Sequence, residues 1–181
     1  MLPGPEEVLH FSEDPTITRF EPHVAATAQQ PEAYVWALDA GRAPCYWFPS
    51  QCPRGTAWVV PTTTAEDRER IIGRGGGDRV HAVEYGWLDR IRTTRLYAYR
   101  FALEPSFRRF PSESEAYAYV STSAVTPLGA PEPVGDLLAL HEEAGIQLRV
   151  LADLRPFWDA VVASTLNFSG IRLANARSAA R

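Results

Sequence analysis

The chain has 181 residues, 45% of them hydrophobic, and a formal net charge of −4 at pH 7. This composition excludes an intrinsically disordered chain, and a charge spread without blocks disfavours sequence-independent binding to duplex DNA. The opening MLPGPEEVLH lacks the regions of a signal peptide, and no run approaches the roughly 20 apolar residues of a membrane span. We therefore expect one cytoplasmic domain over residues 1–181.

Short strands dominate the first part of the chain. Strands are predicted by VLHFS, YVWAL and GTAWVV, which are rich in β-branched and aromatic residues and bounded by Pro, Gly or Asp. TTTAEDRERII predicts a helix, with Thr63 three residues before Glu66 as a capping box. The GRGGGDR that follows lacks the Gly-Lys-Ser/Thr ending of a phosphate-binding loop, and it predicts a hairpin-like connection.

The second part mixes helices with strands. VHAVEYGWLDRIRTT predicts a helix, RLYAYRFAL a strand, and EPSFRRFPSESE a polar connection. AYAYVSTSAV predicts a strand with Tyr117 and Tyr119 on one face. VGDLLALHEEAGI predicts a helix that ends at Gly145, QLRVL a strand, and PFWDAVVASTL a helix with Pro156 at its first position. The fold class is therefore α+β, with a strand-rich core.

The two cysteines, Cys45 and Cys52, are separated by six residues. This spacing matches neither a CxxC redox motif nor a zinc knuckle. In a reducing compartment they are expected to be unbonded, buried thiols, and we expect no metal.

His10 lies in the middle of the first apolar run, directly before Phe11 and Ser12. A lone histidine in such a run is usually a half-buried strand residue. A second feature follows it: the run from Tyr34 to Phe48 predicts a strand, a turn, and a short helical segment that carries Tyr46. This order of elements resembles the ADP-ribosyltransferase fold of the diphtheria-toxin type, in which a histidine, a tyrosine and a glutamate surround NAD. The resemblance implies a split sheet with short flanking helices.

The resemblance also implies roles for single residues. His10 would bind the ribose of the adenosine half, and Ser12 would contact nicotinamide or ribose. Tyr46 and Trp47 would form an aromatic platform for nicotinamide, and the main chain at Phe11 would hold its amide group. Three arginines lie in the segments that would flank the pocket and would bind the pyrophosphate: Arg19, Arg42 and Arg54.

Two positions depart from the family's pattern. Val35 stands where the family has a tyrosine, and Ala118 stands where it has the glutamate. Glu115 is the nearest acid and the predicted catalytic residue, although reaching the site would require a bulge, and Glu113 is an alternative. The tail STLNFSGIRLANAR resembles the ending of a small family of uncharacterised bacterial domains.

Three functions remain open from the sequence. The first is an ADP-ribosyltransferase-like domain that takes NAD as substrate and either transfers ADP-ribose to a protein or nucleic-acid acceptor or hydrolyses NAD. The second is a non-catalytic domain that binds a nucleotide or a protein. The third is an RNA 2′-phosphotransferase-like enzyme, which relies on a histidine with several arginines. A serine hydrolase is disfavoured because the chain has no G-x-S-x-G motif.

Overall fold

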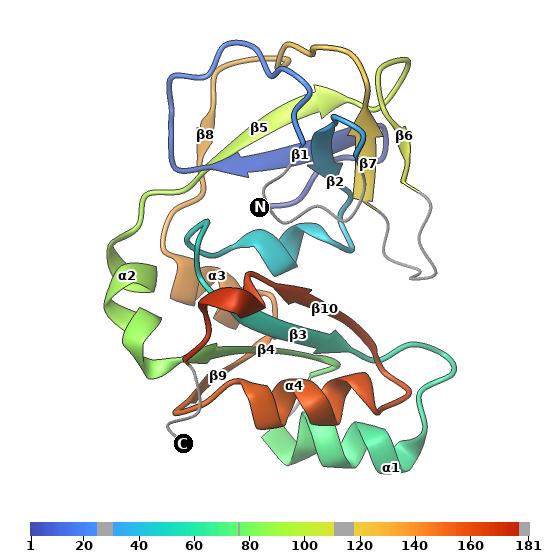
Figure 1. The fold of residues 1–181 in the computed structure, drawn as a ribbon, viewed down its shortest axis with the longest axis vertical. Helices are drawn as coiled ribbons and strands as arrows, with labels where there is room; N and C mark the ends of the chain where they lie inside the picture. Colours follow the sequence, from blue (N-terminus) through green and yellow to red (C-terminus); the bar gives the residue numbers. More distant parts are fainter. Residues whose placement is uncertain (25–30, 76, 111–117, 178–181) are drawn as a thin grey trace. The chain divides into compact units, whose positions relative to one another are not determined.

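The computed structural model describes residues 1–24, 31–75, 77–110 and 118–177. The chain divides into two compact units, each built from two separate segments (Figure 1). The first unit comprises Met1–Ser50 and Arg95–Gly135, and the second comprises Gln51–Thr94 and Asp136–Arg181. Since each unit is described by itself, the single domain expected from the sequence stays a prediction.

The first unit is an antiparallel sheet with the strand order β6-β7-β2-β1-β5-β8. Strand β1 therefore has a neighbour on each side, β2 and β5, and β5 is paired with it along its whole length. The elements of this unit are β1 (Glu7–Ser12), β2 (Val35–Leu38), the 3-10 helix η1 (Ala43–Tyr46), β5 (Tyr97–Ala102), β6 (Arg108–Arg109), β7 (Ala118–Ser121) and β8 (Glu132–Pro133).

One face of this sheet carries the buried core of the first unit. Val8 and His10 lie opposite Phe101 and Tyr99 on β5, so these four side chains share one face. Phe20, from the segment after β1, packs on this face and is fixed by backbone hydrogen bonds with Val125. The buried core of this face consists of Val8, Phe20, Val35, Ala37, Tyr99, Phe101, Phe107 and Val125.

The second unit contains a four-stranded sheet with the order β10-β3-β4-β9, in which only the β4–β9 pair is parallel. Its strands are β3 (Arg54–Trp58), β4 (Arg79–Glu84), β9 (Gln147–Leu151) and β10 (Asn167–Ile171). Its helical elements are α1 (Ala65–Asp67), the π-helical η2 (Arg68–Ile72), η3 (Gly73–Gly75), η4 (Tyr85–Trp87), α2 (Leu88–Thr93), α3 (Leu137–Glu143), α4 (Arg155–Val162) and η5 (Leu173–Asn175).

Helix α4 covers one face of this second sheet through Trp158. Gly55 of β3 and Gly170 of β10 are paired across the two strands, and a Cβ at either position would meet the Trp158 ring. The ring also packs edge-on against Phe168 at 5.5 Å between centroids. The two glycines therefore leave the sheet surface flat where the indole ring packs.

Glu84, at the end of β4, is a buried carboxylate with 2% of its surface exposed. It accepts hydrogen bonds from the backbone N–H groups of Leu154, which precedes α4, and Arg177, near the C-terminus. These bonds attach the start of α4 and the C-terminal segment to the end of β4. Hydrogen bonds of this kind offset the cost of burying a polar carboxylate group.

The structure confirms the α+β class and most of the predicted elements. The strands expected from VLHFS, YVWAL, GTAWVV, RLYAYRFAL and QLRVL are β1, β2, β3, β5 and β9. The helices expected around Leu137 and Trp158 are α3 and α4, and Gly145 follows α3 with φ +64°, the left-handed conformation of a helix stop. The strand expected around Tyr119 is β7, whereas Tyr117 lies outside the described residues.

Three expectations were wrong in detail. VHAVEYGWLDRIRTT is not one helix, because Arg79–Glu84 forms β4 between two other strands and only the part from Tyr85 to Thr93, η4 and α2, is helical. Thr64, not Thr63, caps the helix that begins at Ala65, and its hydroxyl accepts from the N–H of Asp67. Pro156 follows Arg155 in the first turn of α4 rather than starting the helix.

In the described part of the chain no helix has the length and apolarity needed to cross a membrane.

Candidate functional site

His10 lies on β1 and is anchored to the neighbouring strand by its side chain. Its Nδ1 atom lies 2.8 Å from the backbone carbonyl oxygen of Trp36, so Nδ1–H donates to that oxygen. The ring also packs against Phe20, with 4.9 Å between ring centroids. Burial lowers the pKa of His10, and the Trp36 carbonyl opposes that shift. The histidine is therefore a partly buried strand residue, as expected, that also connects β1 to β2.

The bond from His10 marks the point where β1 and β2 stop pairing. Their register comprises one pair, Leu9 with Leu38. The carbonyl of Arg100, which lies opposite Leu9 on β5, accepts from Leu128 N–H and so points away from β1. In an antiparallel ladder, Leu9 and also Phe11, two residues later, must then direct their backbone N–H and C=O toward β2. The backbone groups of Phe11 thus face β2 beyond the last paired residues.

Trp36 provides an aromatic surface at this divergence of the strands. Because Leu38 lies opposite Leu9, and Trp36 is two residues from Leu38, the Trp36 ring shares a face with Leu9 and Phe11. The ring is half-buried and packs against Phe110 at 4.8 Å and Tyr34 at 5.8 Å between centroids. The face opposite His10 therefore carries an aromatic cluster of Tyr34, Trp36 and Phe110.

The other predicted residues of the first unit have diverse surroundings. The Ser12 hydroxyl, on the His10 face, accepts from Asp14 N–H at 3.1 Å. Arg19 forms an exposed ion pair with Glu21 at 2.6 Å. Arg42 and Tyr46 lie at the two ends of η1, and both are half-buried. Trp47 follows Tyr46 and is 1% exposed.

Two predicted residues do not belong to the described part of the first unit. Arg54 belongs to β3 of the second unit, where it is 2% exposed and its guanidinium donates to the carbonyl of Cys52 at 2.8 Å. Glu115, together with its alternative Glu113, lies outside the described residues. What the structure brings together is therefore His10, the Phe11 backbone and Trp36.

Sequence reasoning missed two residues of this region. The sequence does not single out Trp36, because its role depends on which face of β2 it occupies. Glu13 was passed over because it lies outside the strand, yet its carboxylate accepts from Ser50 N–H at 2.7 Å and so connects the end of β1 to the segment after η1. The strand alternation that places Trp36 and Leu38 on one face was the pattern that could have found Trp36.

A comparison with known protein families shows to which family the chain belongs. A family model described as "Family of unknown function (DUF6886)" matches residues 9–176. The chain belongs to this family. Neither the curated proteins nor the solved structures include a match to the DUF6886 chain. Since the family's description states no substrate or reaction, the chemistry of the site is argued from its geometry.

The cysteines of the DUF6886 chain are two separate buried thiols, as expected. Burial raises the pKa of Cys52 to about 12, which keeps its thiol protonated and unreactive. Among the described residues, no group of three or more histidine, cysteine and acidic side chains is arranged to hold a metal ion.

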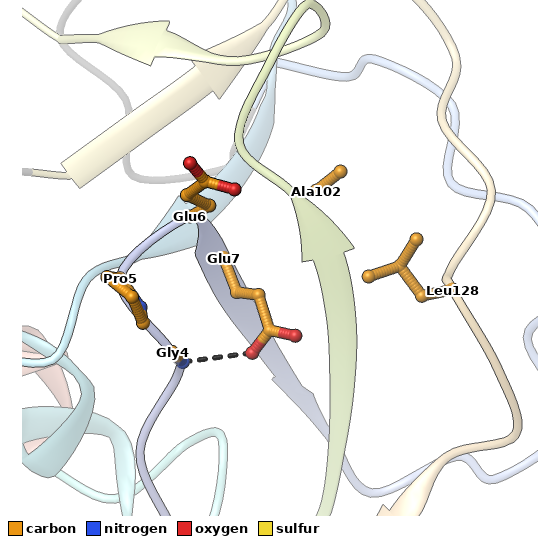
Figure 2. Close-up of a pocket in the computed structure, with 6 residues that line it drawn as sticks. All are labelled: Gly4, Pro5, Glu6, Glu7, Ala102 and Leu128. Atoms are coloured by element: carbon orange, nitrogen blue, oxygen red, sulfur yellow. Dashed lines mark hydrogen bonds between the residues drawn. The ribbon is translucent and has the colours of Figure 1, made fainter.

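An open hollow of about 500 Å³ lies in the first unit at the start of β1, and its lining is largely apolar (Figure 2). The carboxylate of Glu7 there is held by the Gly4 N–H at 2.9 Å and by the Arg100 guanidinium. Both contacts lower the pKa of Glu7. The described lining consists of Gly4, Pro5, Glu6, Glu7, Ala102 and Leu128, which includes none of the predicted site residues.

Proposed function

We propose that the first unit binds NAD or a related nucleotide at the point where β1 and β2 diverge, in the manner of ADP-ribosyltransferase-like domains. The observation that carries this proposal is the hydrogen bond from His10 Nδ1–H to the Trp36 carbonyl. It fixes the two strands relative to each other directly after their paired residues. The backbone of Phe11 and the ring of Trp36 are thereby held at one edge of the divergence.

Nicotinamide has the chemistry that these groups can recognise. Its amide carries one acceptor and two donors, which match the N–H and C=O of one backbone residue, Phe11. Its flat ring matches the half-buried indole of Trp36 by stacking. His10 acts as a positioning residue in this arrangement, because its Nδ1 proton is used to hold the Trp36 carbonyl.

The reaction proposed for the site is cleavage of the glycosidic bond of NAD. The C–N bond breaks, nicotinamide leaves with the electron pair, and water or an acceptor nucleophile bonds to the ribose carbon and loses a proton. Positive charge develops on the ribose, so a carboxylate near its 2′-hydroxyl would stabilise the transition state. Glu115 and Glu113 are the proposed sources, and Glu13 is an acid already positioned near the end of β1.

We expect turnover to be slow unless one of these acids reaches the ribose, because β7 has Ala118 at the position where ADP-ribosyltransferases of the diphtheria-toxin type have the glutamate. A domain that binds the nucleotide without cleaving it is the alternative within this proposal. The acceptor would be a protein or a nucleic acid, and a cytoplasmic location, where NAD is present, is part of the proposal.

Calorimetric titration with NAD, ADP-ribose and a short RNA tests the binding step. We expect NAD to bind, and Trp36→Leu to weaken its binding by tenfold or more, about 1.4 kcal/mol. Trp87→Leu is the matched control, since Trp87 is a half-buried tryptophan of the second unit. Absence of NAD binding up to about 1 mM, the upper end of usual substrate constants, would contradict the proposal. Binding of RNA alone would favour the phosphotransferase-like alternative.

Nicotinamide release tests the catalytic step separately. Glu115→Gln, Glu113→Gln and Glu13→Gln are assayed one at a time, beside Ala118→Glu. We expect the variant of the acting carboxylate to slow release by at least roughly tenfold. If the unmodified protein turns over NAD rapidly and none of the three glutamine variants slows it, the assignment of the acid is wrong. If only Ala118→Glu releases nicotinamide, the natural protein is a binding domain.

A further inference from the structure

Two histidines of the second unit form a buried pair. His81 lies in the middle of β4 and His141 lies on α3, and both are essentially inaccessible to solvent, with 0% and 1% of their surfaces exposed. His81 Nδ1 lies 3.0 Å from His141 Nε2, and the rings meet edge to face at 5.1 Å between centroids. We call His81 and His141 the imidazole pair.

The backbone determines where the protons of this pair lie. His141 Nδ1 is 2.6 Å from the carbonyl oxygen of Leu137, which can only accept, so His141 Nδ1 carries a proton. A neutral His141 then has an unprotonated Nε2, which accepts from His81 Nδ1–H. Both rings are thus neutral Nδ1–H tautomers. Two successive hydrogen bonds run from His81 on β4 to His141, and from His141 to the Leu137 carbonyl in the first turn of α3.

The groups around the pair oppose a further proton. Thr56 of β3 and Leu148 of β9 lie beside His81 in the sheet register, and both are uncharged. Burial lowers the pKa of His81 well below its ordinary value, and His141, Arg79 of β4 and Arg54 of β3 act in the same direction. Burial also lowers the pKa of His141, opposed by the Leu137 carbonyl. On α2, which packs against α3, the charged residues Asp89, Arg90 and Arg92 are exposed.

A proton added to His141 changes this geometry directly. His141 Nε2 would become a donor that faces the Nδ1–H donor of His81 across 3.0 Å. A proton added to His81 keeps the existing bond but places an ion in a buried site beside Arg79 and Arg54. Either charge is relieved when α3 separates from β4 and water reaches the rings.

We propose that the imidazole pair is a pH-sensitive switch, in which mild acid separates α3 from β4 while the rest of the second sheet stays paired. The pair lies outside the proposed nucleotide site, and this inference does not depend on the function proposed for that site. Opening of a single docked helix below pH 6.5 is a local transition of the kind that buried histidines confer.

Amide hydrogen exchange of the full chain between pH 7 and pH 5, corrected for intrinsic exchange, tests the switch. An exposed histidine has a pKa of about 6.5, so at pH 5 opening gains about 30-fold if one ring takes up a proton and up to about 1000-fold if both do. We therefore expect protection of the amides of Ala144 and Ile146, which bond to Leu140 and His141, to fall by at least about 30-fold. Protection of the β3 and β10 amides should change far less.

Two variants separate the pair from other acid effects. His81→Leu combined with His141→Leu removes both titrating rings, and we expect α3 protection to become nearly independent of pH. This double variant retains Asp136, whose carboxylate caps α3, so a loss caused by the cap would persist in it. His23→Gln removes an exposed histidine of the first unit and should behave like the unmodified protein.

If the double variant does not fold, the ¹⁵N NMR spectrum of the imidazole nitrogens of the unmodified protein still tests the proposal. At pH 7 both rings should appear as Nδ1–H tautomers. An Nε2–H tautomer on either ring, or unchanged protection of α3 from pH 7 to pH 5, would overturn the proposal. So would an equal loss of protection in the double variant.

Discussion

Replacing Gly170 with alanine should destabilise the second unit through one rigid contact. A Cβ at Gly170 would lie 2.6 Å from the far carbon of the Trp158 ring and 2.6 Å from a methyl carbon of Leu173. Carbon atoms attract best at about 3.5–4.0 Å, so each contact is too short by about 1 Å. Leu173 can rotate away, but the indole also packs on Gly55 and Phe168. Overpacking of this kind costs about 1–3 kcal/mol.

Urea unfolding of Gly170→Ala, followed by circular dichroism, measures this cost as a lower midpoint with an unchanged slope. Gly129→Ala is the matched control, because its Cβ would meet nothing within 4 Å, and we expect a change within about 0.5 kcal/mol. Adding Trp158→Phe to Gly170→Ala shortens the ring and should recover part of the loss. If Gly170→Ala unfolds at the same midpoint as Gly129→Ala, the steric argument is wrong.

Three further outcomes are expected. Glu84→Ala removes the acceptor of the Leu154 and Arg177 N–H groups, which should cost about 2–4 kcal/mol in urea unfolding, and a loss below about 0.5 kcal/mol would contradict the assigned hydrogen bonds. His10→Phe retains a ring but leaves the Trp36 carbonyl without its donor, so we expect a loss of about 1–3 kcal/mol and weaker NAD binding, measured by urea unfolding and calorimetry. Because the pKa values of the imidazole pair are lowered in the folded chain, the unfolded chain binds more protons below pH 6.5. The free energy of unfolding should therefore fall as the pH decreases, by up to about 1.4 kcal/mol per pH unit per ring. A free energy of unfolding that does not change with pH would exclude this linkage.

Elements with one buried face were predictable from the sequence, whereas elements with unusual burial were not. From Tyr99 to Ala102, β5 alternates between core positions and more exposed positions, so the period of a strand is visible there. Strand β4 lies inside the second sheet and is buried at every position after Arg79, His81 and Glu84 included, so its polar residues do not mark an exposed face as they would in a half-buried strand. Strand β10 was missed because Asn167–Ile171 includes Asn, Ser and Gly, which have low strand propensity.

The candidate site was only partly visible in the sequence for a similar reason. His10 as a half-buried strand residue follows from local composition. Its bond to Trp36 depends on where β1 and β2 stop pairing, which is a property of register between distant segments. The same holds for Glu13, whose partner Ser50 lies beyond another strand and a helix.

The interleaving of the two units has a consequence for how the chain is made. Both segments of the first unit have been synthesised once Gly135 has left the ribosome, whereas the second unit also needs the residues from Asp136 onward. Strands β3 and β4 are synthesised early, but their outer partners β10 and β9 come at the end of the described chain. A nascent chain that stalls before Asn167 therefore carries a complete first unit and a second sheet with β3 unpaired along one edge. Such an open edge can pair with another chain, so the late synthesis of β10 exposes this intermediate to aggregation.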